Sequence, residues 1–344
     1  MMKKISRLFC ATLVFTMTMG SFAACGKGSE ETKYNDARAL IESGEYERAY
    51  AAFKELGDYK DSEKYLSRFV YFPTVANYAL SDRSGSMTVE LGVYNMPSRM
   101  LTVGVEGPEN AAYTKDGVYT YDSEGNLTRQ AVTYNGTLLA YDYTYDGNHN
   151  LIKAEYSVEG VVGAVNDYVY AENGLLVRES YRDGNVVFYD FVNSYDANGN
   201  LIKSEYQAPE GAHVYTNTYN DQGYLVNEHG SVPSGDWYNV DYTYATDGNL
   251  TQSVRTGDEG AICTTNYTYD NAGNCIKEES VYPDGSRETF TWEFDANGNL
   301  TKEQLTSTDG TVETVDWQYA LTYLTMDIPA STMDQILGVF DMTL

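Results

Sequence analysis

The chain has few of the residues that cross-link a fold, bind metals or contact nucleic acids. Its 344 residues include four cysteines, three histidines and seven prolines, and 23 basic side chains stand against 50 acidic ones. The cysteines show neither a zinc spacing such as C-x₂-C nor a disulfide framework. With a net charge of −27 and no clustered Lys and Arg for binding phosphates, we expect no nucleic-acid partner.

Long hydrophobic runs are also missing, apart from one at the N-terminus. Three basic residues precede an apolar run from Leu8 to Phe22, and Phe22-Ala23-Ala24-Cys25 follows. This pattern is typical of a secretory signal, which we assign to residues 1–24. Small residues before a cysteine resemble a bacterial lipobox, which predicts Cys25 as a lipid attachment site and the membrane as a partner. The alternative is ordinary secretion with Cys25 incidental.

The expected location is therefore extracytoplasmic, lipid-anchored to the membrane at the bacterial cell surface. Removing residues 1–24 deletes three basic side chains and no acidic ones, which takes the net charge from −27 to −30. We interpret this acidity as the solubility of an exported surface, with attraction for cations or basic partners as the alternative. Residues 25–32 form a Gly/Ser-containing flexible tether.

Three further segments surround the main part of the chain. Residues 33–69 have helical periodicity and a Gly44-Glu45-Tyr46 break, which predicts a small N-terminal α-helical hairpin similar to a tetratricopeptide unit. One copy favours a spacer or cap over a peptide-binding solenoid. Residues 70–118 contain short β-prone runs between prolines and glycines, interpreted as leading strands that cover the first sheet edge. Residues 326–344 are expected to form a C-terminal cap over the last edge.

Residues 119–325 are an array of repeats 24 or 25 residues long. In each of the first eight units an aromatic anchor starts the turn, a glycine follows four positions later except at His149, and an apolar residue lies six positions after the anchor. A period of this length indicates a repeat architecture. The anchors are Tyr121, Tyr145, Tyr170, Tyr195, Tyr219, Tyr244, Tyr269, Phe294 and Tyr319, and the apolar residues are Leu127, Leu151, Leu176, Leu201, Leu225, Leu250, Cys275 and Leu300.

The turn defines the repeat unit as a β-hairpin. In Tyr195-Asp196-Ala197-Asn198-Gly199-Asn200-Leu201 the residues fit a type I turn with a left-handed glycine, which places Tyr195 opposite Leu201. A second glycine-containing turn lies midway through each period. We therefore predict a mainly β fold, an antiparallel meander of about sixteen strands in a curved or spiral sheet, with one face rich in aromatic residues.

The same register bears on the two cysteines of the array. Cys263 lies six residues before Tyr269 on the aromatic face, and Cys275 occupies the leucine position opposite that tyrosine. Six strand residues span about 20 Å, which is beyond the reach of a disulfide. Both are expected to be apolar filling residues without a disulfide.

The turns resemble the YD repeat of the Rhs family, as in Tyr121-Asp122-Ser123-Glu124-Gly125-Asn126-Leu127 and Tyr269-Asp270-Asn271-Ala272-Gly273-Asn274. The resemblance covers about residues 117–325. Known members coil such hairpins into a hollow β-shell. The chain departs from the family in having few repeats and no Asp-Pro dipeptide of the kind found in the family's self-cleaving motif. We therefore expect neither enclosure nor self-cleavage, but an open curved sheet.

No motif predicts catalytic residues, metal ligands or a cofactor. The D-x-N-G-N turns offer oxygen atoms to calcium, but Asp and Asn also satisfy local backbone groups in turns, and we favour that interpretation. Exposed aromatic residues can stack on sugars, which makes Trp237, Tyr238 and Trp317 candidate ligand contacts; the alternative is that they form the core face.

These observations predict a non-catalytic cell-envelope lipoprotein that acts as a binding or scaffold module. Its ligand would be an envelope polysaccharide or a surface protein. The alternative is an envelope-associated carbohydrate-active enzyme, which needs two facing carboxylates about 5–9.5 Å apart.

Overall fold

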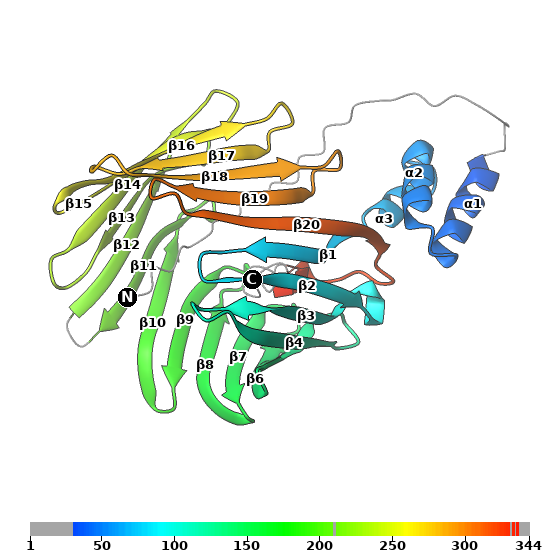
Figure 1. The fold of residues 1–344 in the computed structure, drawn as a ribbon, viewed down its shortest axis with the longest axis horizontal. Coiled ribbons are helices and arrows are strands. Elements are labelled where there is room, and N and C mark those ends of the chain that lie inside the picture. The colour runs from blue at the N-terminus through cyan, green and yellow to red at the C-terminus, as the bar shows by residue number, and fades with distance from the viewer. Residues whose placement is uncertain (1–29, 209–210, 331, 334, 337–344) are drawn as a thin grey trace.

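The structure is a computed structural model that describes residues 30–208, 211–330, 332–333 and 335–336. Cys25 and the predicted signal and anchor lie outside these residues. Within them the chain is mainly β, with a small group of helices beside a large sheet (Figure 1). The helices are α1 (Glu30–Glu42), α2 (Tyr46–Leu56), α3 (Ser62–Leu66) and a single 3-10 turn, η1 (Val93–Asn95).

The described residues form twenty strands in one sheet. They are β1 (Phe69–Ala79), β2 (Arg83–Leu91), β3 (Pro97–Glu106), β4 (Ala111–Tyr121), β5 (Leu127–Tyr134), β6 (Thr137–Tyr145), β7 (Leu151–Val158), β8 (Val161–Tyr170), β9 (Leu176–Asp183), β10 (Val186–Tyr195), β11 (Leu201–Ala208), β12 (Gly211–Tyr219), β13 (Leu225–Ser231), β14 (Trp237–Tyr244), β15 (Leu250–Gly257), β16 (Gly260–Tyr269), β17 (Cys275–Val281), β18 (Arg287–Phe294), β19 (Leu300–Ser307) and β20 (Val312–Tyr323).

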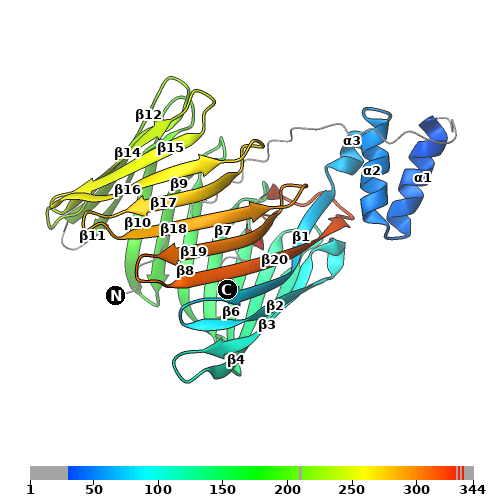
Figure 2. The same ribbon diagram turned by 45° about the horizontal axis from the view of Figure 1, so that its top comes forward.

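The sheet closes on itself. Every strand pairs antiparallel with the next one along the chain, and β20 also pairs with β1, from Phe69 opposite Tyr323 to Ala79 opposite Thr314. Figure 2 shows β20 and β1 side by side. The prediction of about sixteen strands in a curved or spiral sheet is therefore wrong: the sheet has twenty strands and is a closed ring.

The error has a physical cause in the segment before the array. Prolines and glycines obscure its strand pattern, yet Pro73 lies at a register shift in β1 and Pro97 is the first residue of β3. Both are positions where a strand tolerates a missing N–H. Strands β1–β3 therefore complete the ring instead of covering an edge. Closure gives the first and last strands partners for backbone groups that an open edge leaves unpaired.

The predicted turn geometry is confirmed. Tyr195 lies opposite Leu201, the register shifts between Ser194 and Tyr195, and Gly199 has a φ of 86°. The shift inserts one extra residue directly after the leucine, so the alternation of side chains slips by one position beyond it. This slip decides which later residues of each repeat point into the ring.

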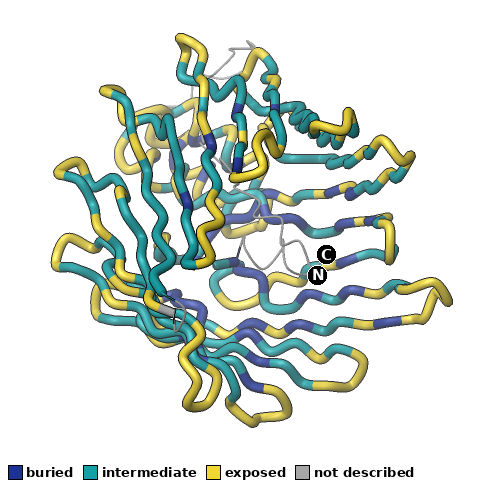
Figure 3. The backbone as a smooth tube through the Cα atoms, turned by 90° about the vertical axis from the view of Figure 1, so that its left-hand side faces the viewer, coloured by how far each residue is buried: buried dark blue, intermediate teal, exposed yellow. Residues whose placement is uncertain are grey.

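The hairpin connections divide into two rims. The Asp-x-x-Gly-Asn turns all lie on one side of the sheet, which we call the repeat-turn rim, and the midway turns lie on the other. The chain enters β1 and leaves β20 at the repeat-turn rim, so the helices and the C-terminal segment are there as well. Figure 3 shows that the turns are exposed and that buried stretches lie within the strands.

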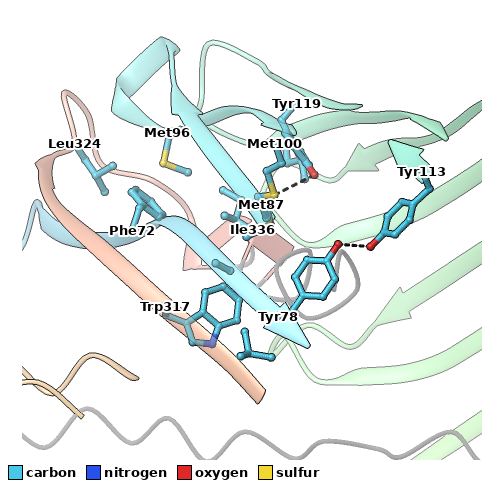
Figure 4. Packing of buried hydrophobic residues seen from close by; sticks show 13 residues of the cluster. Phe72, Tyr78, Met87, Met96, Met100, Tyr113, Tyr119, Trp317, Leu324 and Ile336 are labelled. Carbon is cyan, nitrogen blue, oxygen red and sulfur yellow. Dashed lines mark hydrogen bonds between the residues drawn. The ribbon is translucent and has the colours of Figure 1, made fainter. Parts of the chain in front are cut away.

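The main core identifies the face of the sheet that points into the ring, which we call the inner face. Its buried residues come from β1–β5, from Met96 just before β3, from β20 and from the segment after β20, and Leu300 of β19 and Tyr143 of β6 pack against them. Figure 4 shows Ile336 among Met87, Met100 and Tyr119. Strands from several parts of the ring meet around one segment, so these residues face inwards.

The helices pack around a separate small core outside the ring. Tyr34 of α1 contacts the ring of Phe53 edge-on at 5.9 Å, and Tyr65 of α3 stacks on Phe53 at 4.6 Å. Asn95 links them to the sheet, because its side-chain amide donates to the Tyr46 hydroxyl and to the Tyr323 carbonyl. Among the described residues, no helix has the length and apolar character to span a membrane.

Candidate functional site

The turn residues that define the repeat make structural hydrogen bonds within it. The Asp196 carboxylate accepts hydrogen bonds from the backbone N–H groups of Asn198 and Asn200 at 2.9 and 2.8 Å, and from the Asn200 side-chain amide at 2.9 Å. The same three bonds occur at Asp122, Asp146, Asp270 and Asp295. The turn carboxylates therefore satisfy local donors, as the turn interpretation requires.

These bonds also stabilise the charged form of the carboxylates. The bond from the Asn200 side chain, followed by the backbone bonds, lowers the pKa of Asp196, and the equivalent bonds from Asn150 lower the pKa of Asp146. Within the described ranges, no three His, Cys, Asp or Glu side chains are grouped so that they could hold a metal ion.

The anchor tyrosines tie each repeat to the one before it. The Tyr195 hydroxyl donates to the carbonyl oxygen of Leu176 at 2.7 Å, and the Tyr219 hydroxyl donates to that of Leu201 at 3.0 Å. Tyr145 and Tyr244 contact the carbonyl groups of Leu127 and Leu225 in the same way, at 2.7 and 2.8 Å. Each hydroxyl thus reaches the apolar position of the preceding repeat, and the anchor has a structural role.

Apart from the anchors, the side chains of the inner face are the candidates for contacting a ligand. The extra residue after each leucine shifts the alternation of side chains by one position. As a result, the ninth residue after the anchor points inwards and pairs with the residue two positions before the anchor. Tyr267 pairs with Glu278, and Trp292 pairs with Glu303. The inner residues at this position are Gln130, Ala154, Glu179, Ser204, Glu228, Ser253, Glu278 and Glu303.

A row of half-buried rings crosses the inner face from β9 to β14, and we call it the aromatic band. Tyr181 stacks on Tyr189 at 5.5 Å, Phe191 meets Tyr206 at 4.6 Å, and Tyr206 stacks on His213 at 4.3 Å. Its members are Tyr181, Tyr189, Phe191, Tyr206, His213, Tyr215 and Tyr238, none of them fully buried. Part-exposed rings in a concave face are a typical lining of binding sites.

Polar groups flank the end of the aromatic band. The Tyr238 hydroxyl donates to Glu228 at 2.7 Å, and the Arg255 guanidinium lies 4.6 Å from the centre of the Tyr238 ring. Burial, and then the bond to Glu228, raises the pKa of Tyr238. The ring packs over Gly230, where an added Cβ would lie 2.3 Å from a Tyr238 carbon. Gly230 therefore gives the ring room to lie flat across β13.

The three aromatic candidates from the sequence do not form one site. Tyr238 belongs to the aromatic band, but Trp237 lies on the outer face, 39% exposed and 6.0 Å from the ring of His229. Trp317 belongs to the main core, is 8% exposed, and donates its indole N–H to Glu303 at 3.1 Å. Only Tyr238 lies among the part-exposed rings of the inner face.

The sequence interpretation missed the inner glutamates and most of the aromatic band. Simple alternation places Glu228 and Glu278 on the outer face, but the bulge moves them to the inner face. The sequence alone therefore did not identify either carboxylate as a candidate site residue. The sequence did indicate part of the aromatic band, because Phe191 and Tyr215 lie four residues before their anchors, a position on the aromatic face. The two cysteines take no part in the band, and neither Cys263 nor Cys275 forms a disulfide within the described part of the chain.

The fold and inner face define a closed antiparallel repeat sheet with an aromatic interior surface. No protein-family model and no curated protein matches the chain. Similar solved structures include the TcdB2-TccC3 complex, with 15% identity over 67% of this chain and a TM-score of 0.39. They also include the Tc holotoxin pore of Photorhabdus luminescens, with 15% identity over 71% of this chain and a TM-score of 0.34.

This chain spans only 15% and 17% of those two longer chains. A porin-like protein from Bacteroides uniformis is similar over almost its full length, with 97% of that chain and 74% of this one covered, 12% identity and a TM-score of 0.37.

Proposed function

We propose that this chain is a non-catalytic binding or scaffold module of the bacterial cell envelope, built from YD-type repeats of the Rhs kind and held to the membrane through lipidated Cys25. The ligand is an envelope polysaccharide or a surface protein. The observation that carries the proposal is the aromatic band, because it is a continuous row of part-exposed rings on the inside of a closed sheet.

The band differs from the repeated residues in what its side chains do. The anchor hydroxyls and the turn carboxylates have backbone partners in the fold, so their regularity reflects construction of the sheet. Tyr206 and Phe191 contact other rings and keep part of their surface exposed. Aromatic side chains offer large, rigid contact areas and an electron-rich face, which suits both sugar rings and apolar or cationic side chains.

The binding proposal is tested with a glycan and cell-wall screen on soluble residues 26–344. Tyr238→Ala removes a ring of the aromatic band and should weaken any binding about tenfold or more, which corresponds to about 1.4 kcal/mol. Trp237→Ala is the matched control, because it removes the neighbouring ring on the outer face. Binding that Trp237→Ala weakens and Tyr238→Ala leaves intact would place the ligand outside the ring.

The envelope location is tested separately through Cys25. The basic start, the apolar run and Ala23-Ala24-Cys25 support acylation of this cysteine. We expect Cys25→Ala to abolish acylation and to release the protein from the membrane fraction. A variant that stays membrane-bound and acylated would refute the anchor.

A carbohydrate-active enzyme is the second candidate, and Glu278 supports it. Burial raises the pKa of this inner carboxyl, which is the property that a general acid in glycoside hydrolysis needs. The same screen separates the two candidates. Release of reducing sugar ends that Glu278→Gln abolishes would identify an enzyme, whereas binding without product release supports the module.

A further inference from the structure

One stretch of the inner face already holds a peptide, which is the chain's own C-terminal segment. After β20 the chain turns into the ring, where Ile336 is 1% exposed and packs with Leu127, Met87 and Met100 (Figure 4). Ile328 and Met333 pack against the same cluster. The segment therefore places three apolar side chains on the inner face of the first repeats.

The segment contacts the elements that every repeat shares. The Tyr145 anchor hydroxyl lies 2.6 Å from the side-chain amide oxygen of Gln335. At the turn glycine Gly125, an added Cβ would lie 2.9 Å from Ile328 Cδ1 and 3.3 Å from Pro329 Cδ. An anchor tyrosine, a turn glycine and the leucine position thus form the contact surface.

The same surface recurs further round the ring, where no described segment covers it. Leu127 is fully buried, but its counterparts Leu201 and Leu225 are only half-buried. Gly125 touches the segment, whereas a Cβ added at Gly199 or Gly273 would meet no described atom within 4 Å. Within the described part of the chain, the repeats from β8 to β18 therefore present the peptide-contacting pattern with no peptide against it.

The uncovered part of the inner face is also acidic. Glu179, Glu228 and Glu278 point inwards there, with Arg255 as the one inner-face cation among the described residues of β9–β18. Glu278 is half-buried between Tyr267 and Phe290, and no hydrogen bond or ion pair joins it to the described residues. A half-buried carboxylate with no partner among the described residues favours a ligand that brings a positive charge.

We propose that the inner face from β8 to β18 binds a peptide segment of another protein, one that carries apolar side chains together with Lys or Arg. The chain's own segment shows how such a peptide sits, and the inner carboxylates select its charge. This inference rests on the proposed binding function and narrows its ligand to a polypeptide.

The test uses the mature chain and a synthetic, fluorescein-labelled peptide of residues 326–336 in which Asp327→Lys and Asp334→Lys replace both acids. Fluorescence anisotropy should show saturable binding, about tenfold tighter than for the unaltered peptide and weaker at high salt. Glu278→Gln should weaken binding about fivefold or more. Glu293→Gln is the matched control, because Glu293 lies on the outer face and is 71% exposed, and binding should not change.

Absence of saturable binding, or equal effects of Glu278→Gln and Glu293→Gln, would overturn the peptide assignment. Circular dichroism of both variants confirms that they fold. The glycan screen distinguishes this failure from failure of the proposed function. A chain that binds glycan and no peptide remains a binding module with another ligand, and one that binds neither loses both proposals.

Discussion

At the scale of single residues, the repeat is held together by two side chains that each serve the backbone. The anchor tyrosine donates to a carbonyl group of the preceding repeat, and the turn aspartate accepts from three donors of its own turn. Both kinds of bond satisfy backbone groups, the first at the leucine beside the bulge and the second inside the turn. The resemblance to the YD repeat rests on these two residues. In the structure the tyrosine links its repeat to the preceding one, and the aspartate holds its own turn.

Removing one anchor hydroxyl should cost about the value of one hydrogen bond. Tyr195→Phe deletes the bond to the Leu176 carbonyl, so we expect the free energy of unfolding to fall by about 1 kcal/mol. Phe294 is the natural counterpart, since this anchor lacks a hydroxyl, and Phe294→Tyr should raise stability by a similar amount. Urea unfolding measures both, and an unchanged midpoint for Tyr195→Phe would contradict the structural role of the anchor.

The turn aspartates predict a loss of stability in acid. The Asn200 bond lowers the pKa of Asp196 in the folded protein, so its contribution is complete above the ordinary aspartate pKa of about 3.9. It is lost as the pH falls through the lower folded value. Asp196→Asn should reduce this acid-side loss, because Asn220 fills the same position naturally and still accepts both backbone bonds. Urea midpoints at pH 7 and pH 3 test this, and an equal acid-side loss in wild type and variant would contradict it.

At the scale of elements, each hairpin has an inward face with rings and leucines and an outward face that is mixed but more polar. Leu225 pairs with Tyr219 on the inner face, while Thr243 lies exposed on the outer face beside Gln252. The bulge after the leucine keeps these faces distinct and adds the inner carboxylates. The difference between the two faces, more than the identity of any one residue, determines how the hairpins associate in the sheet.

A charge placed on each face should separate them. Leu225→Asp puts a carboxylate among half-buried apolar groups, and we expect it to lower the free energy of unfolding by about 2 kcal/mol or more. Thr243→Asp should change it by less than about 0.5 kcal/mol. Thermal or urea unfolding measures the difference, and equal effects would contradict the assignment of the faces.

At the scale of the whole molecule, stability depends on pairing between the two ends of the sheet and on the segment inside it. β1 pairs with β20, and the segment after β20 joins residues of β1–β5 in one core. Arg68, just before β1, donates to Asp327 at 2.8 Å, which fastens the segment to the start of the sheet. The same contacts therefore hold the two ends of the sheet together.

The internal segment should contribute like any buried core element. Ile336→Ala removes a side chain that is 1% exposed, and we expect a loss of about 2–4 kcal/mol. The matched control is Ile262→Ala, whose isoleucine is 39% exposed, and its loss should be below about 1 kcal/mol. A small effect of Ile336→Ala in urea unfolding would mean that the ring holds without its internal segment.

The sequence by itself determined what depends on neighbours a few residues away. The aspartate, asparagine and glycine of each turn set the hairpin, its register and the pairing of Tyr195 with Leu201, because turn chemistry acts over a handful of residues. The aromatic side of each strand followed from alternation up to the turn.

Only the tertiary structure decided closure, the position of the C-terminal segment and the inward direction of Glu278. Closure pairs Phe69 with Tyr323. It depends on the twist that accumulates over all the strands, which the sequence of a single repeat does not predict. The inner carboxylates depend on a bulge that shifts the alternation by one residue. The route of the chain after β20 depends on which apolar surface remains uncovered once the ring is complete.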